Sequence, residues 1–126
     1  MEKGSGNVMR LADYVAEACA SFGITDVFLV TGGGAMHLND AFARNASLTY
    51  WPCHHEQACS IAAEGYARVT GRPALVNVTT GPGGTNALTG VYGAYVDSVP
   101  MVVISGSPTL TAYLVMGFTI SMIGIS

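Results

Sequence analysis

The sequence predicts an α/β domain in which a parallel sheet is flanked by helices on both faces. Short, continuous apolar runs alternate along the chain with longer segments of helical periodicity. Parallel strands that are buried on both faces have such runs, and helices connect them. In addition, three of the runs lead directly into glycine, at Gly32, Gly81 and Gly106, as is typical of strand-to-helix turns.

The first half of the chain contains two predicted helices and two predicted strands. Residues 8–22 carry apolar side chains at helical spacing, and Gly23 follows as a helix end signal. The apolar run at 26–31 predicts a strand, which leads through a glycine triplet into a helix at 35–44. The run LTYW at 48–51 predicts a second, short strand.

The second half repeats this alternation. A helix at 55–69 is followed by Gly71 and Pro73, which are typical of a helix end. The remaining predicted elements are a strand at 74–80, a glycine loop at 81–84, a helix at 85–95 and a strand at 100–105.

The composition indicates one domain with a partly covered surface. A chain of 126 residues is long enough for one hydrophobic core. Only 10% of the residues are charged, whereas about 25% is usual in soluble domains. We therefore expect another domain or subunit to cover part of the surface. The net charge of −3 provides no basic footprint, which argues against nucleic acid as a partner.

The cysteines and the two ends of the chain bear on localisation. Three cysteines without a secretory signal predict free thiols in the cytoplasm. Residues 1–7 are predicted to be a flexible lead, since they lack the apolar core of a signal peptide. Residues 108–126 form an atypical apolar tail, and no charged residue follows Asp97.

The tail has two explanations. Its length approaches the roughly 20 apolar residues that cross a membrane. However, it has no basic flank and contains two glycines, so we do not favour a membrane span. We prefer a frameshift, a truncated gene or an erroneous gene model.

Two glycine-rich stretches, GGG at 32–34 and GPGG at 81–84, each follow a predicted strand. In open parallel sheets, ligands bind beyond the carboxyl ends of the strands. Glycine there lets the backbone approach a ligand closely. We therefore predict a ligand-binding edge at these two stretches, and we assign Gly106 only to a tight turn.

The stretch CHHEQACSIAAEGYAR, which begins at Cys53, holds the candidate chemistry. A zinc site is the first interpretation. Cys53, His54 and His55 are consecutive, so they cannot easily converge on one ion. His55 and Cys59 lie one helical turn apart, but that pair is two ligands short of a structural site. We therefore disfavour zinc.

A dinucleotide site is the second interpretation, because TGGGAM follows a strand and opens a helix. The G-x-G-x-x-G pattern fails, since His37 stands where the final glycine belongs. Glu56 also begins a helix and does not end the second strand, as the acidic residue of that fingerprint should.

A catalytic carboxylate is the third interpretation. Glu56 begins a helix, where a negative charge is stabilised, and it lies at the predicted ligand edge. From the residues alone, a catalytic role and a first-turn glutamate that only stabilises the helix remain equal alternatives.

Residues 8–107 resemble part of the N-terminal pyrimidine-binding domain of thiamine diphosphate-dependent enzymes, above all the acetolactate synthase-like group. The resemblance lies in VFLVTGGGAMHLNDAF and in HEQ, AAEGYAR, GPGGTN and DSVP at their spacing. It implies an incomplete thiamine diphosphate-binding fold. It also implies an enzyme that decarboxylates a 2-keto acid and joins the product to a second carbonyl compound.

The resemblance assigns roles to residues. It implies that Glu56 is catalytic and hydrogen-bonds a ring nitrogen of the cofactor's aminopyrimidine. The cofactor-binding residues that it implies are Gly32, Gly33, Gly34, Glu56, Pro82, Gly83, Asn86 and Ser98. Ser98 matches a serine near the flavin of flavin-containing relatives, so FAD binding is left open.

Other positions bear on the reaction and on assembly. His54 stands where many acetolactate synthases carry arginine, which leaves the exact reaction open. His55 matches a histidine of the family, with a helix-start role as the alternative. Ala58, Ala62, Ala63 and Gly65 are expected to allow close packing at a subunit interface.

In the resembled family, a separate domain with a GDG…N pattern holds magnesium and the diphosphate, and this sequence lacks that pattern. We therefore expect no metal ligands in this chain and no catalysis by it alone. The expected assembly is a homodimer, a homotetramer or a pair with a diphosphate-domain subunit. A small subunit of a two-chain decarboxylase and a non-catalytic assembly module are the alternatives.

Overall fold

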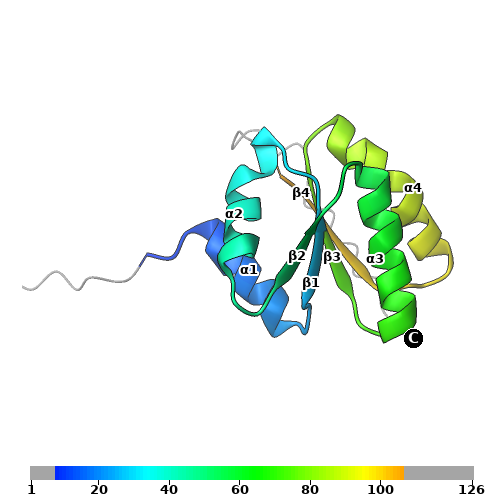
Figure 1. Cartoon of the computed structure of the whole chain (residues 1–126), viewed down its shortest axis with the longest axis horizontal. Coiled ribbons are helices and arrows are strands. Elements are labelled where there is room, and N and C mark those ends of the chain that lie inside the picture. The colour runs from blue at the N-terminus through cyan, green and yellow to red at the C-terminus, as the bar shows by residue number, and fades with distance from the viewer. Residues whose placement is uncertain (1–7, 107–126) are drawn as a thin grey trace, which may run out of the picture.

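The structure, a computed structural model, describes residues 8–106 as a four-stranded parallel sheet between two helical layers (Figure 1). Its elements are α1 (Leu11–Ser21), β1 (Asp26–Leu29), the 3-10 turn η1 (Gly33–Ala35), α2 (Met36–Arg44), β2 (Thr49–Pro52), α3 (Glu56–Thr70), β3 (Ala74–Thr79), α4 (Pro82–Val96) and β4 (Met101–Gly106). The strand order is β2-β1-β3-β4, and every neighbouring pair is parallel. The predicted fold class is confirmed. The predicted lead at 1–7 and tail at 108–126 lie outside the described residues.

The inner strand β3 is buried on both faces of the sheet. Leu75 packs into one apolar cluster together with Phe42 of α2 and Ala16 of α1. Val76 and Val78 pack into a second cluster with residues of α3 and α4. Figure 1 shows the two helix pairs on opposite sides of the sheet. Burial on both faces explains why apolar residues dominate this strand, in which Asn77 is a buried polar exception.

Helix α4 begins earlier than the sequence predicted. Pro82, Gly83 and Gly84 were assigned to a loop, but they form the first turn of α4. Proline suits this position, because an N–H there has no partner within the helix and the φ of proline is already helical. The loop assignment was therefore wrong for all of the stretch except Gly81, which turns the chain with a φ of 64°.

The assignment of Gly106 to a tight turn was also wrong. Gly106 is the last residue of β4 and pairs with Thr79. A Cβ added at Gly106 would lie 2.5 Å from the carbonyl oxygen of Gly34 and 2.9 Å from Cα of Ala35. Glycine is needed here because η1 packs directly on the strand.

Helices α3 and α4 pack through small side chains, which form a seam between them. The two helices bury mainly small residues, namely Gly83, Ala87, Gly90 and Ala94 on α4 and Cys59, Ser60, Ala63 and Ala67 on α3. A Cβ added at Gly90 would lie 2.3 Å from Oγ of Ser60 and 2.7 Å from the backbone nitrogen of Ile61. Ala63, expected at a subunit interface, is instead buried within this chain.

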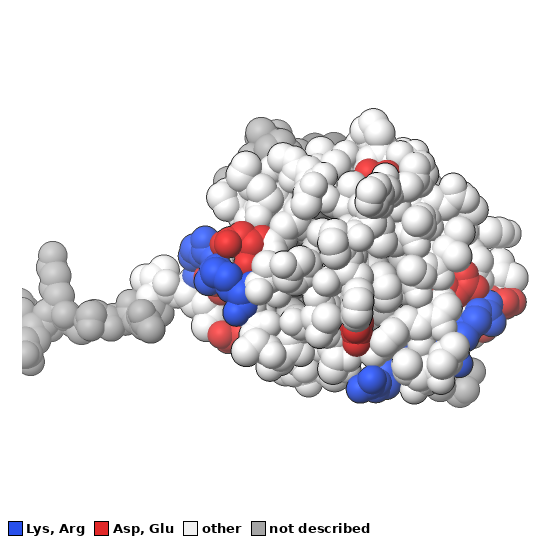
Figure 2. Space-filling model, viewed as in Figure 1, with Lys and Arg blue, Asp and Glu red and all other residues white. Residues whose placement is uncertain are grey.

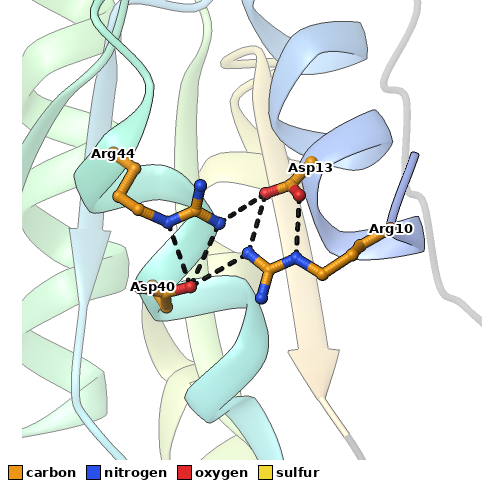
Figure 3. A network of polar contacts seen from close by, with 4 residues as sticks. All are labelled: Arg10, Asp13, Asp40 and Arg44. Atoms are coloured by element: carbon orange, nitrogen blue, oxygen red, sulfur yellow. Dashed lines mark hydrogen bonds and ion pairs between the residues drawn. The ribbon is translucent and has the colours of Figure 1, made fainter. Parts of the chain in front are cut away.

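Hydrogen bonds among four charged side chains connect α2 to the start of α1 (Figure 3). Arg10 donates to Asp13 at 2.8 Å and to Asp40 at 3.0 Å. Arg44 donates to the same carboxylates at 2.7 Å and 3.1 Å. Because solvent reaches these groups and screens their charges, each pair contributes little to stability. The network therefore orients the two helices more than it stabilises the fold.

Much of the molecular surface is uncharged. In Figure 2, the charged side chains gather mainly toward two ends of the molecule and leave a broad white face between them. Large apolar side chains of α4 are exposed, namely Leu88, Tyr92, Tyr95 and Val96. Over residues 8–106, no helix is long and apolar enough to cross a membrane.

Asp26, at the start of β1, accepts hydrogen bonds from its neighbours. Oγ1 of Thr25 donates at 2.6 Å and Nε1 of Trp51 at 2.8 Å. Burial alone would raise the pKa of Asp26. The hydrogen bonds from Thr25 and Trp51, the nearby hydroxyl of Tyr66 and the charge of Arg72 outweigh burial and lower the pKa below its ordinary value of 3.8.

Gly90→Ala tests the close packing of α3 against α4. The new Cβ would collide with Ser60 and with the α3 backbone, and overpacking of this kind costs about 1–3 kcal/mol. Gly65→Ala is the matched control, because a Cβ there meets nothing within 4 Å and helix propensity favours alanine by up to about 1 kcal/mol. Urea unfolding should show opposite signs for the two variants; equal losses would contradict the seam.

Asp26 should make stability depend on acid pH. Because its folded-state pKa is lowered, its contribution is present above the unfolded-state pKa and is lost as pH falls through the folded value. Asp26→Asn should therefore flatten the fall in unfolding free energy below about pH 4. Glu17→Gln, an exposed change on α1, is the control. Identical pH profiles for Asp26→Asn and the unmodified chain would overturn this expectation.

Candidate functional site

The connections after β1 and β3 leave the sheet toward opposite faces. The chain passes from β1 through η1 into α2 on one face, and from β3 into α4 on the other (Figure 1). The two strands are neighbours, with Leu29 beside Asn77. Ligands bind at such a switch point, outside the carboxyl ends of the strands. The glycine stretches at 32–34 and 81–84 both lie at this edge.

Glu56 lies at the same edge of the sheet. It follows β2, which pairs with β1 on the side away from β3. It is the first residue of α3, where an anionic side chain is stabilised by the helix dipole. His55 caps this helix, since its Nδ1 accepts the backbone N–H of Gln57 at 3.1 Å. This contact supports the helix-start role of His55. His54 is exposed and makes no such contact within the described residues.

The first turns of α4 lie beside the Glu56 carboxylate. Nδ2 of Asn86 donates to Oε2 of Glu56 at 3.1 Å. A Cβ added at Gly83 would lie 3.5 Å from Oε1 of Glu56. Pro82 precedes Gly83 in the same turn and is exposed. The fold thus brings Glu56 together with Gly83 and Asn86, three residues that the resemblance had singled out.

The side chain of Thr79, the last residue of β3, lies between the glycine triplet at 32–34 and this group. A Cβ added at Gly32 would lie 2.7 Å from Cβ of Thr79, whereas one added at Gly33 would meet nothing within 4 Å. Thr79 is not among the residues that the sequence motifs predicted for the site. Its position at a strand end between two glycine stretches is the signal that could have identified it.

Ser98 does not join this group. It follows α4 and precedes β4, so it lies at the opposite edge of the sheet. The 15 residues of α4 span about 22 Å between the two edges. Ser98 has a φ of 55°, which is uncommon for a residue other than glycine.

Cys59 lies one turn after Glu56 and is fully buried. Burial raises the pKa of its thiol, and the neighbouring Cys53 and the charge of Glu56 raise it further. Cys59 therefore stays protonated and packs as a small apolar side chain. Among residues 8–106, His, Cys, Asp and Glu side chains form no group of three or more that could hold a metal ion.

A separate hollow of about 430 Å³ lies between α1 and α2. Asp13 and Arg44 line it, but they already pair with each other at 2.7 Å. Its walls come from the helices opposite α3 and α4. We therefore place the candidate site at the sheet edge around Glu56 and not in this hollow.

Three similar proteins are acetolactate synthases. The acetolactate synthase large subunit of Haemophilus influenzae is 43% identical over 106 residues, which are 84% of this chain and 18% of the relative. That of Buchnera aphidicola subsp. Schizaphis graminum is 42% identical over 99 residues, 79% of this chain and 17% of the relative. The chloroplastic acetolactate synthase of Arabidopsis thaliana is 42% identical over 95 residues, which are 75% of this chain and 14% of the relative. The chain thus spans less than a fifth of the length of these relatives.

A family match covers most of the chain. The family described as "Thiamine pyrophosphate enzyme, N-terminal TPP binding domain" matches residues 9–120; thiamine pyrophosphate is another name for thiamine diphosphate. The parallel sheet, with Glu56 at its carboxyl edge, agrees with the resemblance found in the motifs. The chain therefore belongs to the thiamine pyrophosphate enzyme family, as an N-terminal TPP-binding domain.

Proposed function

We propose that this chain is the pyrimidine-binding part of an acetolactate synthase-like enzyme, which decarboxylates a 2-keto acid and joins the remaining fragment to a second carbonyl compound. The observation that carries the proposal is the carboxylate of Glu56, held by Asn86 beside Gly83 at the switch point of the sheet. The names of the similar relatives support the reaction class.

The residues at this edge fit an aminopyrimidine ring. The backbone at Gly33 and Gly81 borders open space, since a Cβ at either position would meet nothing within 4 Å. Asn86 donates a hydrogen bond to Oε2 of Glu56, whereas Oε1 accepts no hydrogen bond from the described residues. Such a carboxylate oxygen, beside Gly83 and at the same edge of the sheet as these open glycines, suits a ring nitrogen that shares a proton with it.

In this proposal, each side chain has a separate task. The cofactor, when bound, supplies the carbanion chemistry of the reaction. Glu56 holds a proton at a pyrimidine ring nitrogen. Asn86 fixes the orientation of the carboxylate through Oε2, and the N-terminal turn of α3, capped by His55, stabilises its negative charge.

The diphosphate and magnesium are proposed to be held by another domain or subunit, because the sequence lacks the GDG…N pattern. The exposed side chains of Leu88, Tyr92 and Tyr95 on α4 fit a surface that such a partner covers. The assembly is then a homodimer, a homotetramer or a pair with a diphosphate-domain subunit, in the cytoplasm. A flavin at Ser98 would lie at the sheet edge opposite Glu56.

Glu56→Gln tests the proposed role of the carboxylate. The amide keeps the shape of the side chain but cannot take up the shared proton. With the chain combined with the diphosphate-binding domain of a relative, we expect acetolactate formation to fall by about 10²–10⁴-fold, the usual contribution of general acid–base catalysis. The measurement is the initial rate at saturating thiamine diphosphate, magnesium and 2-keto acid.

Glu64→Gln on the same helix is the matched control. Glu64 pairs with Arg68 nearer the C-terminal end of α3, so this variant should keep its rate. An unchanged rate for Glu56→Gln would contradict the proposed role. Turnover by the purified chain without any partner domain would contradict the proposed division of the site.

A further inference from the structure

Thr79 contacts both glycine stretches at the carboxyl edge of the sheet. A Cβ added at Gly32 would lie 2.7 Å from Cβ of Thr79, and one added at Gly83 would lie 2.8 Å from Cγ2 of Thr79. Both distances are shorter than real side chains allow. The backbones of the two stretches therefore rest directly on the Thr79 side chain, one from the β1 side and one from the α4 side.

Thr79 is itself held firmly. It pairs with Gly106 in the register of β3 and β4. Its carbonyl oxygen accepts the hydroxyl of Ser105 at 3.0 Å. A branched Cβ also restricts the side chain to few rotamers. Thr79 thus acts as a rigid spacer between the two stretches.

The contacts lead from Thr79 to the carboxylate of Glu56 without a direct contact between them. Cγ2 of Thr79 limits how far Gly83 can move toward the sheet. A Cβ added at Gly83 would lie 3.5 Å from Oε1 of Glu56. Asn86, one turn further along α4, donates to Oε2 at 3.1 Å. A small shift of this turn would lengthen that hydrogen bond beyond a useful range.

We propose that Thr79 is a positioning residue, whose Cγ2 methyl sets the separation of the two glycine stretches and so keeps Asn86 in hydrogen-bonding contact with Glu56. The inference rests on the proposed function, because it assigns Thr79 to the same pyrimidine-binding edge. Its geometric content can be tested without any catalytic assay.

The test combines substitutions in the full chain. Gly83→Ala should lower the melting temperature and move the side-chain amide resonance of Asn86, because the new Cβ meets Cγ2 of Thr79. Thr79→Ser removes only that methyl group, and Cβ of residue 79 then lies 3.7 Å from the added atom. The Thr79→Ser/Gly83→Ala double variant should therefore recover both signals.

Gly32→Ala is the matched control. Its added Cβ meets Cβ of Thr79 at 2.7 Å, and serine retains that atom. Thr79→Ser should not rescue Gly32→Ala. Thr79→Val, which keeps a branched side chain of the same shape, should leave the Asn86 resonance in place. Failure to rescue Gly83→Ala, or equal rescue of both glycine variants, would overturn the proposal.

A titration with thiamine separates this inference from the proposed function, provided that the chain is combined with the diphosphate-binding domain of a relative, as in the Glu56→Gln assay. We expect the single Thr79→Ser change to raise the apparent thiamine dissociation constant by roughly tenfold, because small misplacements of binding groups are costly. The Thr79→Ser/Gly83→Ala double variant should restore thiamine binding. Rescue of the Asn86 resonance without thiamine binding to any variant would support the spacer and refute the proposed function.

Discussion

The candidate site requires α3 and α4 to pack closely against each other. Glu56 begins α3 and Asn86 lies near the start of α4, so their hydrogen bond requires the two helices to lie side by side. Gly90 permits this approach, since it has no side chain to collide with Ser60 and the α3 backbone. At the far end, Arg68 joins Glu64 of α3 to Asp97 after α4.

The same use of small side chains explains the unusual surface. When glycine and alanine occupy the seam, the large side chains of α4 remain outside, and Tyr92 and Tyr95 are more than half exposed. An apolar surface of this kind is typical of a face that meets another protein or domain. In the proposed function, Glu56 contacts one part of the cofactor and a partner domain holds the diphosphate.

The local signals in the sequence predicted the elements well, and failed where one residue type serves several purposes. Helical periodicity identified α1 and α3, and apolar runs identified all four strands to within two residues of their ends. The predicted loop at 81–84 became a helical turn, and Gly106 became a strand residue. Glycine allows a turn, a helix start or a close approach, and only the neighbouring backbone distinguishes these cases.

The fold class, the order of elements and Glu56 as the candidate carboxylate follow from the amino-acid sequence, because periodicity, glycine stops and motif spacing are local properties of the chain. Two relations emerge only in the folded chain, namely that Asn86 holds Glu56 and that Thr79 separates the two glycine stretches. These relations depend on β1 lying between β2 and β3. Strand order is set by how whole helices pack across the sheet, which local patterns do not record.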